Sequence, residues 1–183
     1  MDKRLENTYT NLQKSMRSLL ADTTWDKINV KSLCDLAGVS RSTFYSHFKS
    51  KDDLLDSLLL QFEEALLAEN NARSVKVDGK FCFLPLLLNH VRQNRDLFAK
   101  NNTSVEGYAI AIRFKKLITR LVEAELKAAF SPGIVNPTRV EYIAGGIYSS
   151  LVQWSEQKED TLHLKALNEL DELNNQIISF HIQ

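Results

Sequence analysis

The sequence predicts an all-α protein, and three observations lead to this expectation. Apolar residues recur at spacings of three and four along most of the chain, which is the period of an amphipathic helix. No segment shows the sustained two-residue alternation of a half-buried strand. The 183 residues include only six glycines and three prolines, few for a chain with many tight turns. This length allows one domain or two small ones, with a core that needs neither disulfides nor metal.

The first two helices have recognisable ends. The apolar stripe of the first helix stops at the polar residues 22–24. Trp25 and Ile28 follow in a short connection, where we expect them to seal the core. Asn29 is a suitable N-cap for a second helix, and Gly38 ends that helix, as glycine commonly does.

Two further helices follow closely. Ser40 is expected to cap a third helix over residues 41–48. Ser50 and Asp53 have the spacing of a capping box, which predicts a fourth helix over about residues 51–70.

The rest of the chain continues the helical pattern after a polar stretch at residues 70–80, which is the best linker. Pro85 and Pro137 each fit the first turn of a helix, where a missing N–H is tolerated. The remaining predicted helices cover about residues 81–94, 96–100, 105–130, 137–157 and 162–180.

Residues 29–48 match a helix-turn-helix, in which two short helices meet at a tight turn. Ala37 and Gly38 supply the small residues needed where the helices cross. The apolar residues expected inside are Leu33, Val39, Phe44 and Phe48. Polar side chains are then left for the outer face of the second short helix.

That outer face carries the side chains that read a major groove. Arginine can bond guanine in a bidentate way, and hydroxyl groups can reach base edges or phosphates. Lys31 and Lys51 lie near helix starts and add positive charge. Tyr45 is also compatible with a partly buried position. The residues expected to contact DNA are Lys31, Ser40, Arg41, Ser42, Thr43, Tyr45, Ser46, His47 and Lys51.

Charge is distributed unevenly, although the net charge is zero. Residues 1–51 hold nine basic and five acidic residues, a net +4, and residues 52–183 hold 14 basic and 18 acidic residues, a net −4. A basic end favours a polyanionic partner, although a chance distribution also explains so small a difference.

Residues 25–55 resemble the DNA-binding domain of the TetR/AcrR transcriptional regulators. The features that coincide in register are Ala37-Gly38-Val39-Ser40, Phe44-Tyr45, His47-Phe48, Lys51 and Leu54-Leu55. The segment Ser42-Thr43-Phe44-Tyr45 looks most like one branch of the family, which includes regulators resembling the dihydroxyacetone-kinase operon activator.

The resemblance implies a TetR-like architecture of about nine helices. Residues 1–50 would form a three-helix DNA-binding domain, and residues 51–183 a helical effector-binding and dimerisation domain, with helix 51–70 connecting the two. The family usually binds a small effector, forms a homodimer through its last two helices and acts in the bacterial cytoplasm.

Two further sets of residues are predicted for the second domain. A small-molecule effector would contact large apolar side chains, although such residues equally fill a dense core. These are Phe81, Phe83, Leu87, Phe98, Tyr108, Ile112 and Trp154. Small and apolar residues near the C-terminus could form the dimer contact, with internal packing as the alternative. These are Ile143, Gly146, Ile147, Ser150, Leu151, Trp154, Leu167, Leu170, Asn174 and Ile177.

Other classes of function receive little support. No catalytic arrangement, Gly-rich phosphate loop or set of metal ligands stands out, so we expect neither an enzyme nor a cofactor. Cys34 and Cys82 are expected to be free thiols in a reducing compartment. The longest apolar run is eight residues, far short of a membrane span.

The sequence therefore predicts a homodimeric, effector-responsive repressor that binds a palindromic operator in double-stranded DNA. Whether binding represses or activates depends on where the operator lies. The alternative is a helical co-regulator or ligand-binding module without specific DNA binding.

Overall fold

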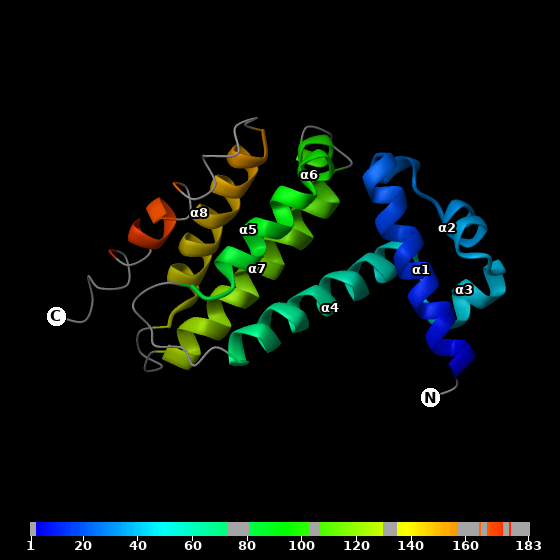
Figure 1. Ribbon diagram of the computed structural model, residues 1–183, viewed down its shortest axis with the longest axis horizontal. Coiled ribbons are helices and arrows are strands. Elements are labelled where there is room, and N and C mark those ends of the chain that lie inside the picture. The colour runs from blue at the N-terminus through cyan, green and yellow to red at the C-terminus, as the bar shows by residue number, and fades with distance from the viewer. Residues whose placement is uncertain are drawn as a thin grey trace. The chain divides into compact units, whose positions relative to one another are not determined.

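The structure is a computed structural model, and every regular element in the residues it describes is a helix (Figure 1). The described residues are 3–72, 81–102, 107–129, 135–156, 165, 168–173 and 176. The helices are α1 (Lys3–Asp22), the 3₁₀ turn η1 (Trp25–Lys27), α2 (Val30–Ala37), α3 (Arg41–His47), α4 (Lys51–Ala72), α5 (Leu84–Gln93), α6 (Arg95–Asn102), α7 (Tyr108–Ala129) and α8 (Pro137–Glu156). The predicted all-α class is confirmed.

The chain forms two compact units. Unit 1 consists of residues 1–62 and 100–113, and unit 2 of residues 63–99 and 114–183. Helices α4, α6 and α7 each contribute residues to both units. The units therefore divide inside α4, twelve residues beyond the boundary predicted at residue 50. The division into a DNA-binding and an effector-binding domain remains a functional prediction.

The predicted ends of α2 are confirmed. Asn29 Oδ1 accepts a hydrogen bond from the Ser32 N–H at 3.0 Å, and Ser32 Oγ accepts one from the Asn29 N–H at 3.2 Å. This reciprocal pair satisfies two amides that the first turn leaves without helical partners. Gly38 ends the helix with φ of 67°, a left-handed conformation that favours glycine.

The start of α4 differs in detail from the predicted capping box. Ser50 Oγ accepts a hydrogen bond from the Asp53 N–H at 3.2 Å, as expected. The Asp53 carboxylate instead accepts from the N–H of Lys49 at 2.9 Å, one residue earlier than the box requires. Both contacts still hold the chain at the turn between α3 and α4.

Helix α5 begins three residues later than predicted, because a distant carboxylate takes up the preceding amides. Glu125 of α7 accepts hydrogen bonds from the N–H groups of Cys82 and Phe83 at 2.9 and 3.0 Å. Pro85 lies in the first turn, as expected. The predicted linker at 70–80 begins later, because α4 continues to Ala72, and residues 73–80 lie outside the described residues.

The bounds of the last helices differ slightly from the prediction. Helix α7 starts at Tyr108 rather than near residue 105, and α8 ends at Glu156, one residue before the predicted end. The helix predicted over residues 162–180 is described only at residues 165, 168–173 and 176, all of them helical.

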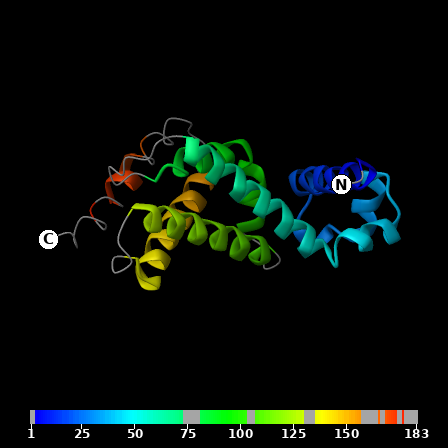
Figure 2. The same ribbon diagram turned by 90° about the horizontal axis from the view of Figure 1, so that it is seen from below.

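The core of unit 1 lies among α1, α2 and α3. Helix α2 contacts both α1 and α3, and the three stay together when the view is turned by 90° (Figures 1 and 2). Leu12, Met16, Leu33 and Phe44 are fully buried there. Trp25 and Ile28 are buried as predicted. Burial of these side chains fixes the position of α3 on the unit.

The core of unit 2 is built mainly from α5, α7 and α8, and α5 contacts α8. Leu87 of α5, Leu117 and Leu121 of α7 and Ile147 of α8 are all at most 1% exposed. Among the described residues, no helix combines the length and apolar character needed to cross a membrane.

Candidate nucleic-acid interface

Helix α3 has one face buried in unit 1. Phe44 is 0% exposed, and its ring meets the Tyr45 ring edge-on with the centroids 5.4 Å apart. Phe48, which follows the helix, is 4% exposed and packs against Phe44 and Tyr9. Because these aromatic side chains occupy the inner face, the rotation of α3 about its axis is fixed.

The opposite face of α3 is polar and exposed. Arg41, Ser42, Tyr45 and Ser46 are exposed, and Tyr45 keeps 58% of its surface in solvent. This excludes the partly buried position that the sequence allowed for Tyr45. A long cationic side chain, two hydroxyls and a phenol therefore face solvent together on one short helix, as direct readout of bases requires.

The first turn of α3 is ordered by hydroxyl groups. Ser40 Oγ accepts a hydrogen bond from the Thr43 N–H at 3.1 Å, which confirms Ser40 as the N-cap. The same oxygen lies 2.7 Å from Ser42 Oγ and 2.8 Å from Thr43 Oγ1. Ser46 Oγ donates to the carbonyl of Thr43 at 2.7 Å. These contacts position the hydroxyl groups in advance of any binding.

Lys31, in the first turn of α2, is exposed. Thr43 and His47, two other predicted DNA contacts, are less exposed. Thr43 is half-buried by the capping contacts described above. His47 is also half-buried: its ring lies 6.3 Å from that of Phe48, and its Nε2 atom is buried without a hydrogen-bond partner in the described structure. Contact of His47 with DNA stays a prediction.

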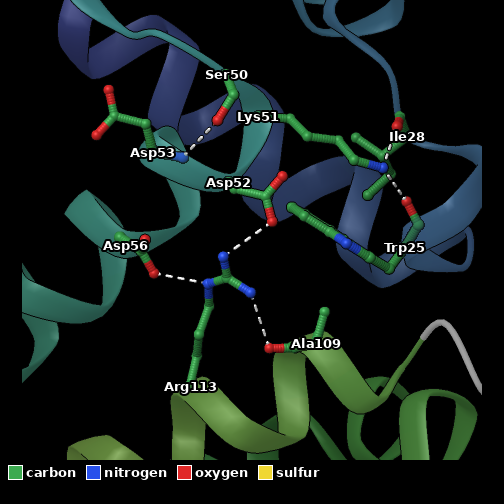
Figure 3. Close-up of polar contacts among 9 residues, drawn as sticks. All are labelled: Trp25, Ile28, Ser50, Lys51, Asp52, Asp53, Asp56, Ala109 and Arg113. Carbon is green, nitrogen blue, oxygen red and sulfur yellow. Dashed lines mark hydrogen bonds and ion pairs between the residues drawn. The ribbon is translucent and has the colours of Figure 1, made fainter.

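Lys51 lies differently from the other predicted contacts. Its Nζ donates to the carbonyl oxygens of Trp25 and Ile28, each at 2.8 Å (Figure 3). The same atom is 4.3 Å from the centroid of the Trp25 ring. These contacts do not test binding to a phosphate, but they give the ammonium group partners within its own chain.

A second group of polar contacts in unit 1 was not predicted. Arg113 of α7 binds two carboxylates near the start of α4: Asp52 lies 2.9 Å from its Nη2 and Asp56 2.7 Å from its Nε (Figure 3). Its Nη1 donates to the carbonyl of Ala109 at 3.1 Å. No local sequence pattern predicts the pair of Arg113 and Asp56, because the two residues are 57 positions apart.

The predicted effector contacts are divided between the two units. Phe81, Phe83, Leu87 and Trp154 are buried in unit 2, and Phe98 is half-buried against Phe114, with centroids 4.8 Å apart. Tyr108 and Ile112 belong to unit 1 and are 67% and 37% exposed. Whether any of the seven contacts a ligand remains untested.

The apolar residues among the predicted dimer contacts on α8 are buried within a single chain. Ile143, Ile147, Leu151 and Trp154 are at most 3% exposed within a single chain, so they are core residues of unit 2. Apolar periodicity marks a buried stripe but does not say which partner buries it. Gly146 is exposed and Ser150 half-exposed, and the neighbouring Tyr142 is 69% exposed.

The other predicted dimer contacts lie near the C-terminus. Leu170 is buried, whereas Leu167, Asn174 and Ile177 lie outside the described residues. Among the residues that the structure describes, no three His, Cys, Asp or Glu side chains gather to hold a metal ion. Cys34 is buried and Cys82 half-buried, and both are free thiols.

A tight glycine turn between two short helices, with a polar face on the second helix, defines a helix-turn-helix DNA-binding protein. Residues 16–58 match the model of the family described as bacterial regulatory proteins, tetR family. This match covers the helix-turn-helix and its flanking residues, and it supports the resemblance to TetR-family regulators that the sequence suggested. Nothing in these comparisons tests the resemblance to the dihydroxyacetone-kinase branch.

Known relatives agree with this assignment. The HTH-type transcriptional regulator UidR of Escherichia coli K12 is 28% identical over 68 residues, covering 37% of this chain and 35% of UidR. The match to this curated relative thus spans about a third of its length.

Two solved structures share the fold over nearly the whole chain. A TetR transcriptional regulator from Streptococcus agalactiae superposes with a TM-score of 0.68 at 24% identity, covering 97% of this chain and 96% of that one. RolR in complex with the ligand resorcinol superposes with a TM-score of 0.56 at 15% identity, covering 98% and 96%.

Proposed function

We propose that this regulator is a homodimeric, effector-responsive repressor whose α3 helices read a palindromic operator. The observation that carries the proposal is the orientation of α3: Phe44 anchors its inner face, which leaves Arg41 and Tyr45 exposed on the outer face. Arginine is well suited to guanine, and the tyrosine ring and hydroxyl suit a thymine methyl group and a phosphate.

Charge supports contact with the DNA backbone. The net charge of +4 on residues 1–51 would attract a polyanion and make binding depend on salt. Exposed Lys31 adds a cation at the start of α2. Phosphate contacts of this kind position the protein, whereas α3 carries the sequence preference.

Two copies would give the length of site that specific regulation needs. In a dimer, two recognition helices enter successive major grooves about 34 Å apart, so a two-fold protein fits an inverted repeat. Burial of Ile143, Ile147, Leu151 and Trp154 removes them from this proposal. The dimer would then use the exposed face of α8, including Gly146 and Tyr142, together with residues near the C-terminus.

The proposal of a small-molecule effector is supported by the aromatic content of unit 2 and by the likeness to RolR, which was solved with resorcinol. An effector would release DNA only if it binds one conformation of the dimer better than the other. We propose that all this takes place in the cytoplasm.

Selection from a random duplex pool at near-physiological salt tests the proposal. We expect the wild-type protein to enrich an inverted repeat, and the variant Arg41→Ala/Tyr45→Ala to lose sequence preference. The control Arg92→Ala/Tyr108→Ala removes the same residue types at exposed positions outside α3. No enrichment with folded wild-type protein, or unchanged preference in the α3 variant, would contradict the proposal.

A further inference from the structure

Lys51 is the first residue of α4, yet its side chain is directed into unit 1. Its Nζ lies 2.8 Å from the carbonyl oxygens of both Trp25 and Ile28, residues more than 20 positions earlier in the chain (Figure 3). The ammonium also lies over the face of the Trp25 indole, 4.3 Å from the ring centroid. A cation in this position is attracted by the ring as well as by the two carbonyl dipoles.

The two carbonyls belong to the turn that leads into the helix-turn-helix. Trp25 begins η1, and its carbonyl also accepts the Ile28 N–H at 3.2 Å. Ile28 directly precedes Asn29, the N-cap of α2. Trp25 and Ile28 are 5% and 1% exposed, so water has poor access to this turn. Without Lys51, the Ile28 carbonyl would lose a donor at a buried position, which is unfavourable because water cannot readily replace it.

These contacts use most of what the lysine can offer. An ammonium group has three N–H donors and no acceptor, and two of the donors are directed at the carbonyls. Partial burial lowers the pKa of Lys51, against the opposing charges of Asp52 and Asp26. A phosphate contact would therefore compete with bonds that already exist in the free protein.

We propose that Lys51 is a positioning residue for DNA recognition: it holds the Trp25–Ile28 turn and thereby sets where α2 begins and where α3 lies. It acts from inside the protein instead of as a contact to a phosphate. The inference rests on the proposed DNA-binding function. It assigns to α4 a role in shaping the recognition unit.

Arginine and methionine substitutions separate the two roles. A phosphate contact tolerates arginine, whereas the planar guanidinium cannot replace a compact ammonium between two carbonyls and a ring face. We therefore expect Lys51→Arg and Lys51→Met both to lower affinity at least tenfold. The probe is the duplex that the wild-type protein selects from a random pool, with binding followed by fluorescence anisotropy.

Salt dependence supplies the second readout, with Lys31 as the matched control. Lys31→Met should lower the slope of log affinity against log salt by about one, and Lys31→Arg should restore it. Lys51→Arg should keep the wild-type slope despite its lower affinity. Loss of one phosphate contact sets the scale for Lys51→Met, which should change the slope by less than about half of that amount. Wild-type affinity in Lys51→Arg, with a slope about one lower in Lys51→Met, would overturn the proposal.

Measurements without DNA keep this inference distinct from the proposed function. In a Trp154→Phe background, we expect Lys51→Met to change Trp25 emission and to speed hydrogen exchange of the Leu33 amide, which bonds to the Asn29 carbonyl at 3.1 Å. If both stay unchanged in folded protein, the proposal fails. If Lys51→Met does not fold, Lys51→Arg decides by the same measurements. If wild-type protein selects no duplex, DNA binding fails, while these measurements still report on the turn.

Discussion

Arg113 of α7 joins Asp56 of α4 through a contact of 2.7 Å between Nε and Oδ1. Asp52, one helical turn earlier, lies 2.9 Å from Nη2 of the same guanidinium. Both carboxylates are near the N-terminus of α4, where negative charge is favourable to the helix. The contact ties the first turns of α7 to the first turns of α4 within unit 1.

We expect a modest coupling between Arg113 and Asp56, because the side chains are 24% and 56% exposed and solvent screens them. A double-mutant cycle with Arg113→Met and Asp56→Asn should give about 0.5–1 kcal/mol in urea unfolding. The exposed pair Lys127 and Glu123, 2.7 Å apart on one helix, serves as the control and should give about 0.3 kcal/mol. A cycle that closes at zero would show that the contact contributes nothing.

The pair of Glu63 and Arg120 in unit 2 should respond asymmetrically. Arg120 Nε lies 2.8 and 3.0 Å from the two oxygens of Glu63, whose side chain is only 11% exposed against 48% for Arg120. Arg120→Met leaves a nearly buried carboxylate without this partner and should cost about 2 kcal/mol. Glu63→Met leaves an arginine that water can reach, so it should cost less in the same unfolding assay. The reverse order would contradict the burial argument.

Gly38 should tolerate substitution poorly for reasons of backbone conformation alone. Its φ is 67°, and a Cβ added there meets no atom within 4 Å. Gly38→Ala should therefore lower the free energy of unfolding by about 1–2 kcal/mol, and Gly38→Asn by less. Thermal unfolding of both variants measures the difference. Equal losses would indicate that the left-handed conformation is not the cause.

Gly146 offers a test of the proposed dimer. It is exposed in the middle of α8, and an added Cβ meets no atom within 4 Å in the single chain. Gly146→Ala should stabilise the protomer by about 1 kcal/mol through helix propensity. If another copy packs closely against α8 there, the same change should weaken dimerisation in sedimentation equilibrium. An unchanged dimer constant would remove Gly146 from the interface.

Cys34 should make the folded protein less stable at alkaline pH. Burial raises the pKa of its thiol, an effect that Asp35 reinforces and Arg41 opposes. A raised pKa in the folded state means that the protonated thiol is favoured by folding. The stabilisation is complete below the unfolded pKa, which is about 8.5, and is lost as pH rises toward the folded pKa.

The measurement for Cys34 is urea unfolding of wild type and Cys34→Ala at pH 7.5 and 9.5. The wild-type protein should lose more stability between these two pH values than the variant does. Iodoacetamide should also modify half-buried Cys82 before Cys34 in the native protein. Equal pH dependence of the two proteins would show that the thiol does not contribute.

Local chemistry explains why so much of unit 1 could be predicted. The ends of α2 and the start of α3 depend on Asn29, Gly38 and Ser40, whose roles involve neighbours within five residues. For Tyr45 the residues alone left a partly buried position open, and the family resemblance favoured the exposed position that the structure shows. Helix ends of this kind depend on residues close together in the sequence, and the tertiary packing is consistent with them.

The sequence by itself determined the helical class, the helix-turn-helix and the resemblance of residues 25–55 to a family of regulators. Only the tertiary structure decided which side chains form contacts with residues that are distant in the sequence. Lys51 meets carbonyls 26 and 23 residues away, and Glu125 binds the two amides that precede α5, more than 40 residues earlier in the chain. The stripe on α8 was visible as apolar periodicity, yet its burial inside unit 2 depended on packing with other helices. Hydrophobic burial is non-directional, so periodicity predicts that a face is covered, and only the folded chain selects what covers it.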